Sequence, residues 1–523
     1  MSEMPDATFV RLQMLQQMDP PVSQRGVVKW GRENLFSGWF STGLTLLSLL
    51  VLYWLVALAL PWLLHGVWNA SSQVECRAIV AERFGPDASG ACWAMIHNRW
   101  YQFIFGFFPP TAWWRPVVDF ALLFVALAPI LYSDNRRTAA ILVGTVSVLT
   151  VLIMLALEFS DYLVVGTAVL MAGLTLVAYT MTHRLLWLVA IYPFLSVWLL
   201  WGGSIWGPVS AAVGFTAVGF VIVYAQRSYG ALLSMLVGVV AFLVIFLDPL
   251  STILDLVAIP ASWIAGPVTL DFGLTLGGHH YSIRDLFPLY SHVSTNLQQW
   301  LPFGLAYVES DRFGGFLLAF VIGVSSISIS LPIGILFALG RQSNMFLIHA
   351  LSVGFIEFVR GVPLITMLFV ASLLLQYFLP PGNNFDLILR VVILVTLFSA
   401  AYIAEVVRGG LAALPKGQYE AANALGLDYW QAQRLIIMPQ ALKVSIPGIV
   451  STFIGLFKDT TLVAFVGLLD PLLGVTKTIR ADIAWKGIYW EPYIFVGAIF
   501  FVVCFGMSRY SMYLEGKLKT DHR

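Results

Sequence analysis

The sequence predicts an all-α polytopic membrane protein with about twelve spanning helices. Of its 523 residues, 59% are hydrophobic and only 11% are charged, whereas a soluble domain carries about 25% charged residues. The apolar residues form continuous runs rather than alternating patterns. Because lipid offers the backbone no hydrogen-bond partners, such runs must be helices. The net charge of +1 points to no nucleic-acid or acidic partner.

Seven spans are expected in the N-terminal half of the chain. They cover residues 42–65, 116–131, 138–157, 163–181, 185–201, 209–224 and 230–247. About forty mostly polar residues precede the first span, which is too long for the charged region of a signal peptide. We therefore expect insertion to begin at the first spanning helix.

Five further spans are expected in the C-terminal part. They cover residues 313–339, 348–378, 387–407, 445–469 and 493–513. A long polar segment separates them from the first seven. Within it, the stretch 253–268 is apolar but is broken by Pro260 and Pro267, and we expect it to lie at the membrane interface.

The orientation follows from basic residues in short turns, because cytoplasmic loops are enriched in Lys and Arg. Arg136 and Arg137, then Arg184 and then Arg227 lie in alternate turns, and the turns between them contain no Lys or Arg. This count places both termini in the cytoplasm and both long loops outside. The predicted organisation begins with a cytoplasmic segment (1–40) and a membrane extension of about seven helices (41–247), which includes a periplasmic loop (66–115). A second periplasmic loop (248–311) follows. The chain ends with a core (312–516), which includes a cytoplasmic loop (414–440), and a cytoplasmic tail (517–523).

Three cysteines are present. Cys504 lies in an apolar run and is expected in the core. Cys76 and Cys92 share the first long loop, where an oxidising compartment would allow a disulfide between them. The alternative for this pair is two free thiols.

Ionisable residues concentrate in the five C-terminal spans, which contain Glu357, Arg360, Glu405, Lys458 and Asp459. The first seven spans contain almost none, with Asp119 as the main exception. Charges at membrane depth are costly and usually mark a transport pathway or an internal contact. The chemistry of the protein is therefore expected in the C-terminal part.

The most informative cytoplasmic segment covers residues 414–448. It reads LPKGQYEAANALGLDYWQAQRLIIMPQALKVSIPG. Residues 418–425 favour a short helix that ends at Gly426, and Asp428 with Gln431 three residues later has the pattern of a capping box that starts a second helix. Two short helices joined at a glycine would fit a groove of a partner protein. An amphipathic connector lying on the bilayer is the alternative that spacing leaves open.

Four segments of the core carry motifs that occur in a recognisable order. They are Glu420-Ala421-Ala422 followed by Gly426, EFVRGVPLITMLF (357–369), AAYIAEVVRGGLAALPKGQYEAANALG (400–426) and LFKDTTLVAFVG (456–467). The first looks like the EAA signature of ABC importer permeases, and the others resemble motifs of the permeases for polar amino acids. The resemblance covers roughly 313–515 and implies the five-helix core of a type I ABC importer permease.

The sequence departs from the pattern of this family at three positions. Met367, Val362 and Thr461 stand where glutamine, threonine and serine are common. These differences bear on substrate preference rather than on the family. The long N-terminal half resembles the large M-type subunits of general L-amino-acid and glutamate/glutamine/aspartate/asparagine importers of Gram-negative bacteria.

The resemblance implies an inner-membrane permease subunit that moves polar L-amino acids from a periplasmic binding protein into the cytoplasm. It implies as partners a second, related permease chain and an ATPase dimer. The phosphate-loop pattern GxxxxGK[ST] does not occur in the sequence. We therefore expect ATP and Mg²⁺ on the separate ATPase, no cofactor on this chain, and no catalytic role for it.

The resemblance also assigns roles to residues. The expected ATPase contact consists of Glu420, Ala421, Ala422, Leu425, Gly426 and Asp428. The expected substrate pathway consists of Glu357, Arg360, Gly361, Pro363, Met367, Lys458, Asp459 and Thr460. The expected structural support of this loop (414–440, the coupling loop) consists of Glu405, Arg408 and Pro439. No metal-ligand spacing is found for His279, His280 and His349.

A zwitterionic amino acid in a low-dielectric core needs partners for both of its charges. The carboxylate of Asp459 suits the ammonium group, and a helix interrupted near Pro363 frees backbone N–H groups for the carboxylate. The alternative for Asp459 is an internal ion pair with Lys458 or with the partner subunit. The i,i+3 spacing of Glu357 and Arg360 also allows a purely structural ion pair.

Two other functions are compatible with a polytopic membrane protein. An ion-coupled secondary transporter would have inverted repeats, whereas the two halves here differ in charge and length. An intramembrane enzyme would need a nucleophile with its base, or metal ligands, at membrane depth, and the sequence offers neither pattern.

Overall fold

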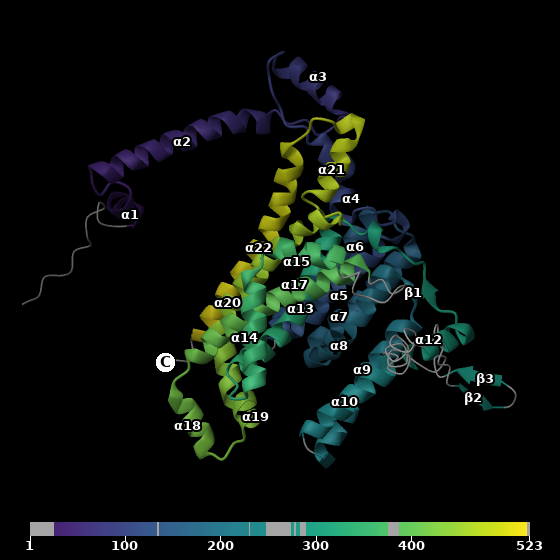
Figure 1. Cartoon of the computed structure of the whole chain (residues 1–523). Coiled ribbons are helices and arrows are strands. Elements are labelled where there is room, and N and C mark those ends of the chain that lie inside the picture. Colours follow the sequence, from purple (N-terminus) through teal and green to yellow (C-terminus); the bar gives the residue numbers. More distant parts are fainter. Residues whose placement is uncertain are drawn as a thin grey trace, which may run out of the picture. The chain divides into compact units, whose positions relative to one another are not determined.

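The computed structural model describes residues 26–132, 135–229, 231–246, 273–276, 279–282, 289–374 and 386–519, and these are mostly helical (Figure 1). The chain forms two compact units. Unit 1 comprises Met1–Arg99 and Arg480–Glu491, and unit 2 comprises Trp100–Ile479 and Pro492–Arg523. This grouping differs from the predicted organisation, because a short segment from the C-terminal core packs with the N-terminal residues.

Unit 1 begins with α1 (Gly26–Asn34) and the apolar α2 (Trp39–Leu64), none of whose 26 residues is buried. The segment expected as the first periplasmic loop contains α3 (Gln73–Phe84) and α4 (Ala94–Phe105). The Ser72 side chain caps α3 by accepting a hydrogen bond from the Glu75 backbone N–H. The Ser71 hydroxyl and backbone N–H bond to the Glu75 carboxylate and lower its pKa.

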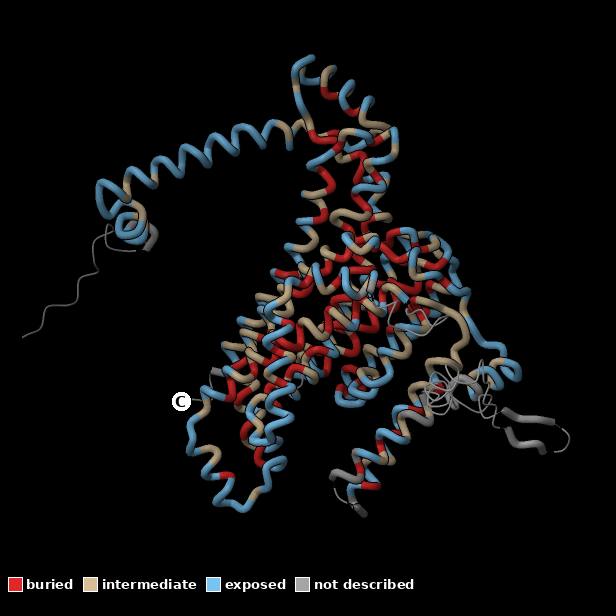
Figure 2. Tube along the Cα trace, in the orientation of Figure 1, coloured by how far each residue is buried: buried red, intermediate tan, exposed pale blue. Residues whose placement is uncertain are grey.

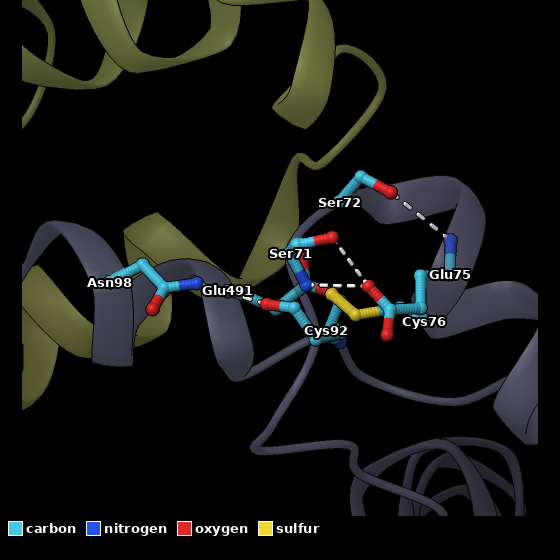
Figure 3. Close-up of a disulfide and its surroundings, with 8 residues drawn as sticks. Ser71, Ser72, Glu75, Cys76, Cys92, Asn98 and Glu491 are labelled. Carbon is cyan, nitrogen blue, oxygen red and sulfur yellow. Dashed lines mark hydrogen bonds between the residues drawn. A yellow bond between two sulfur atoms is a disulfide. The ribbon is translucent and has the colours of Figure 1, made fainter.

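Two contacts within unit 1 join residues that are far apart in the sequence. The backbone N–H of Cys92 donates to Glu491 at 2.8 Å, and Arg99 forms an ion pair with Asp482 at 2.6 Å. The structure also joins Cys76 to Cys92 in a disulfide with a Cα–Cα distance of 5.8 Å (Figure 3). These contacts explain why residues 480–491 belong to this unit.

The N-terminal part of unit 2 is a group of apolar helices. It consists of η2 (Pro110–Ala112), α5 (Trp114–Leu131), α6 (Arg136–Ala156), α7 (Asp161–Met181), η3 (Thr182–Leu185), α8 (Leu186–Trp201), α9 (Trp206–Tyr229) and α10 (Ala231–Phe246). Strand β1 (Gly203–Ser204) pairs antiparallel with β4 (Gly304–Leu305), which follows α12 (Leu289–Trp300). A second hairpin pairs β2 (Gly273–Leu276) with β3 (His279–Ser282). The expected interfacial stretch 253–268 lies outside the described residues.

The C-terminal core follows η5 (Ser310–Arg312). Its elements are α13 (Gly315–Arg341), α14 (Phe346–Gly361), α15 (Leu364–Phe369), η6 (Val370–Leu374), α17 (Leu387–Ala412), α18 (Lys416–Ala424), α19 (Tyr429–Ala432), η7 (Gln433–Ile437), α20 (Met438–Asp459) and η8 (Thr460–Val466). It ends with α21 (Gly474–Ala481), η9 (Ile483–Trp485) and α22 (Trp490–Lys519).

A helix lies at each of the twelve positions where a span is predicted. Within the described residues, nine helical stretches are long and apolar enough to cross a membrane. One of them, Asp161–Trp201, contains both α7 and α8. The remaining difference comes from α10 and α14, which have 16 residues each and are shorter than the ~20 residues of a typical span. The second core span is shortened because it breaks after α14 and continues as α15.

Close packing between α13 and α17 forms the centre of the core. A Cβ added to Gly334 of α13 would lie 2.7 Å from the Ile403 side chain of α17, so the small residue allows the backbones to approach. Buried apolar residues gather in the same region, including Ile356, Val407 and Ile437. Figure 2 shows buried residues along these core helices and exposed residues along α2.

Candidate functional site

The loop after α17, which is expected to be cytoplasmic, has the predicted two-helix form. Helix α18 ends before Gly426, which has a φ of +71°, a value that favours glycine. Asp428 then caps α19 in a complete capping box, in which the Gln431 N–H donates to the Asp428 carboxylate at 2.7 Å and the Gln431 side chain accepts from the Asp428 N–H at 3.2 Å. The predicted capping box and glycine ending are confirmed.

The second of the two expected short helices is the beginning of a longer helix. Helix α19 continues through the π-turn η7 into α20. Pro439 lies in the first turn of α20, directly after the π-turn η7. A proline inside a continuous helix removes one backbone hydrogen bond, and the π-turn lies where this bond is missing. Ile437 is fully buried in the core cluster with Ile356 and Val407. The loop is therefore held to the core at the point where it enters the membrane helix.

The loop presents apolar side chains away from this anchor. Leu425 is 74% exposed, Trp430 is 63% exposed and Tyr429 is also exposed, whereas Ala422 is buried. Glu420, Ala421 and Asp428 are exposed too. A contiguous set of large exposed apolar residues marks an interaction surface. We call the exposed face of residues 420–430 the loop face.

Five charged side chains from three helices form a cluster around Glu405. Arg408 on the same helix donates its Nε–H to Glu405 at 2.8 Å, and Arg341 of α13 donates to Glu405 at 3.1 Å. Arg341 also donates to Glu357 of α14 at 2.9 Å, and Arg360 lies 3.8 Å from Glu405. These contacts tie α13, α14 and α17 together. We refer to these five residues as the charge cluster.

The sequence predicted one of these pairs correctly. The i,i+3 pair of Glu405 with Arg408 is confirmed. The pair of Glu357 with Arg360 is wrong, because among the described residues Glu357 pairs with Arg341 and Arg360 pairs with Glu405. The predicted site residues do not include Arg341. Its position in the last turn of an apolar helix is the signal by which Arg341 could have been included among them.

The second core helix is interrupted where the sequence predicted. Helix α14 ends at Gly361, Val362 and Pro363 adopt extended backbone angles, and α15 starts at Leu364. Met367 is half-buried in α15, and its N–H donates to the Pro363 carbonyl. The short helix after the break contacts η8 and α17. The interruption therefore lies beside the end of α20.

Asp459 is the last residue of α20, and the helical stretch Tyr429–Val466, which is long and apolar enough to cross a membrane, continues past it as η8. The hydroxyls of Thr460 and Thr461 donate to the carbonyls of Phe457 and Lys458, at 2.7 and 2.9 Å. These bonds accompany the change from the α-helix to the tighter 3₁₀ segment η8. Asp459 is half-buried, Lys458 is exposed, and the ion pairs of the described residues do not include either one.

The predicted pathway residues thus fall into two groups. Glu357 and Arg360 belong to the charge cluster, with Gly361 at the adjoining helix end. Pro363 and Met367 lie on the segment that contacts η8, and Lys458, Asp459 and Thr460 lie at the junction of α20 and η8. In the described part of the chain, no group of three or more His, Cys, Asp or Glu side chains has the arrangement of a metal site.

The helical core, with its interrupted second helix and the exposed loop after α17, is the part of the chain that matches a family of binding-protein-dependent importers. The family described as "Binding-protein-dependent transport system inner membrane component" matches residues 330–520. The chain is 55% identical, over 99% of its length and 100% of the relative, to the glutamate/glutamine/aspartate/asparagine transport system permease protein BztC of Rhodobacter capsulatus. It belongs to the family of amino-acid ABC transporter permeases.

A second relative agrees with this family, and a solved structure aligns with part of the chain. The inner membrane amino-acid ABC transporter permease protein YhdY of Escherichia coli is 33% identical over 95% of this chain and 94% of its own length. A solved structure described as an amino acid ABC transporter with histidines aligns with 38% of this chain and 91% of its own chain, at 30% identity and a TM-score of 0.35. The predicted family, fold class and transport function are confirmed: the chain is an inner-membrane permease component of an amino-acid importer.

Proposed function

We propose that this permease imports acidic amino acids and their amides, together with a second, different permease chain and a separate ATPase dimer. The observation that carries the proposal is the continuity of the helix between the loop face and Asp459. Helix α20 has 22 residues and is therefore roughly 33 Å long. The loop precedes its first residue, and Asp459 is its last.

The loop face is the proposed ATPase contact. Leu425, Tyr429 and Trp430 are exposed and would fill an apolar groove of the ATPase. The Gln440 amide of α20 donates to the Gln418 side chain of α18 at 3.0 Å, which links the first short helix to α20. Displacement of the loop by ATP-driven ATPase closure would therefore move α20 and the segment that follows it.

The junction at Asp459 is the proposed site for the amino-acid backbone. Its carboxylate would pair with the substrate ammonium group, and the N–H groups at the start of α15, freed by the break at Pro363, would bind the substrate carboxylate. The charge cluster contains three arginines and two glutamates. Its excess positive charge suits substrates with an anionic side chain, as the name of the relative from Rhodobacter capsulatus also suggests.

The remaining partners and the orientation are part of the same proposal. A periplasmic binding protein would deliver the amino acid, and both termini would lie in the cytoplasm, as the positions of Arg136, Arg184 and Arg341 in the turns indicate. A second permease chain of related sequence would complete the translocation pathway.

The test is uptake by proteoliposomes that contain both permeases, the ATPase and the binding protein. We expect ATP-dependent uptake of glutamate, glutamine, aspartate and asparagine, and much weaker uptake of lysine as a cationic control. An ATPase variant that binds but does not hydrolyse ATP should abolish uptake. Uptake that continues without ATP and follows an ion gradient would overturn the proposal.

A further inference from the structure

We propose that unit 1 contains a second amino-acid site, separate from the residues assigned to the translocation pathway. The site is a cavity of about 520 Å³ between α3, the disulfide and the residues around the start of α22. Cavities that bind small molecules usually measure about 300–1,000 Å³. The choice of an amino acid as ligand rests on the proposed function, whereas the requirement for two opposite charges comes from the cavity itself.

Glu491 supplies a negative charge that the protein does not neutralise. Its side chain is 6% exposed and lines the cavity. One carboxylate oxygen accepts the 2.8 Å hydrogen bond from the Cys92 N–H (Figure 3), and the other has no partner among the described residues. This second oxygen is therefore available to a ligand in the cavity, and a ligand cation would form a charge-assisted contact with it.

Arg77 supplies the opposite charge. It lies on α3 and also lines the cavity. In the described part of the chain it has neither a hydrogen bond nor an ion pair, so it does not pair with Glu491. An α-amino acid carries an ammonium group and a carboxylate on one carbon, and would satisfy both residues at once.

The remaining walls suit the apolar body of such a ligand and are held in place. Trp62, Tyr489 and Trp490 contribute aromatic surface, which also attracts cations. The Arg480 guanidinium lies 3.9 Å from the centre of the Tyr489 ring. The disulfide fixes the base of α3 opposite Glu491.

A glycine allows the two sides of the cavity to approach. Gly487 has a φ of +100°, and a Cβ there would lie 2.9 Å from the Gln73 side chain. Gln73 lines the same cavity and offers both a donor and an acceptor. The position therefore combines backbone freedom with close contact to the proposed site.

The experiment uses the full-length chain in nanodiscs without binding protein or ATPase, with L-glutamine as the probe. Equilibrium binding and hydrogen exchange of peptides from 73–92 and 487–491 are measured in parallel. We expect saturable binding with protection of both peptides. Glu491→Gln and Arg77→Gln should each weaken binding about tenfold or more, since each removes a charge-assisted contact.

Matched controls keep the test specific. Glu82→Gln and Arg83→Gln alter exposed residues of the same helix that do not line the cavity, and should bind L-glutamine as the parent chain does. Glu491→Gln keeps an oxygen for the Cys92 N–H, and thiol titration verifies the disulfide. N-acetyl-L-glutamine lacks the ammonium group, so the parent chain should prefer L-glutamine while Glu491→Gln should lose that preference.

Binding that leaves both peptides unprotected, or that is unchanged in Glu491→Gln and Arg77→Gln, would overturn this inference. Uptake by the complete reconstituted importer distinguishes this result from failure of the proposed function. Normal ATP-dependent uptake combined with unprotected peptides refutes the second site alone. Absence of uptake refutes the proposed function, whatever the peptides show.

Discussion

Carboxylates in the two helical parts of unit 2 are stabilised in different ways. Asp119 of α5 is buried, and one of its oxygens accepts hydrogen bonds from Ser196 at 3.1 Å and Tyr192 at 3.3 Å, both on α8. Glu405 of the core is instead surrounded by three arginines. Neutral hydroxyl donors join two helices of the extension, whereas ionic contacts join three helices of the core. From this difference we expect Asp119 to serve stability alone, and the charge cluster to lie in the part of the chain that changes during transport.

The largest expected effect comes from the loop face. Gly426→Val places a β-branched residue at a φ of +71°, which such residues strongly disfavour. We expect uptake to fall at least tenfold and the ATPase to dissociate, with the chain still inserted. Co-purification of the ATPase and coupled ATPase activity measure this.

Gly417→Val is the matched control, because Gly417 lies within α18 and has open space around it. It should retain most ATPase association. Normal coupled activity in Gly426→Val would show that the loop is not the coupling element.

The next effect is expected at the end of α20. Asp459→Asn keeps the size of the side chain and removes its charge, so the substrate ammonium group would lose its partner. We expect roughly tenfold lower uptake, corresponding to about 1.4 kcal/mol, with an intact complex by size-exclusion chromatography. Normal uptake in this variant would place the substrate site elsewhere.

A smaller effect is expected on stability, and it should differ between the two glutamates of the charge cluster. Glu405→Gln affects contacts with three arginines, whereas Glu357→Gln affects contact with Arg341 alone. We expect Glu405→Gln to lower stability by about 1–3 kcal/mol and Glu357→Gln by less than ~1 kcal/mol. Thermal unfolding in detergent gives both values, and equal losses would contradict the central position of Glu405.

The smallest effect is expected in the extension. Asp119→Asn keeps an oxygen that accepts from Ser196 and Tyr192, and should leave uptake unchanged. Asp119→Ala removes the acceptor and should cost about 1–3 kcal/mol of stability while uptake per assembled complex stays normal. A transport defect in Asp119→Asn with normal stability would break the contrast between the extension and the core.

The sequence predicted features that depend on neighbouring residues. A helix lies at each span predicted from the apolar runs, and Gly426, Asp428 and Gln431 located the turn and cap of the loop. It failed where distant residues decide. The pairing of Glu357 with Arg341 joins two helices, whereas an i,i+3 rule considers one helix. One local feature was also not predicted: the change from α20 to the 3₁₀ segment after Asp459 accompanies hydroxyl-to-carbonyl bonds of Thr460 and Thr461, which hydrophobicity does not register.

The hydrogen bond between Cys92 and Glu491 also bears on when unit 1 can finish folding during translation. Its partners lie 399 residues apart, and those of the ion pair between Arg99 and Asp482 lie 383 apart. The two cysteines are 16 residues apart, so their bond can form while the rest of the chain is still being translated. Glu491 emerges from the ribosome only after most of the other membrane helices. Unit 1 therefore starts to fold among the first segments made and is completed among the last.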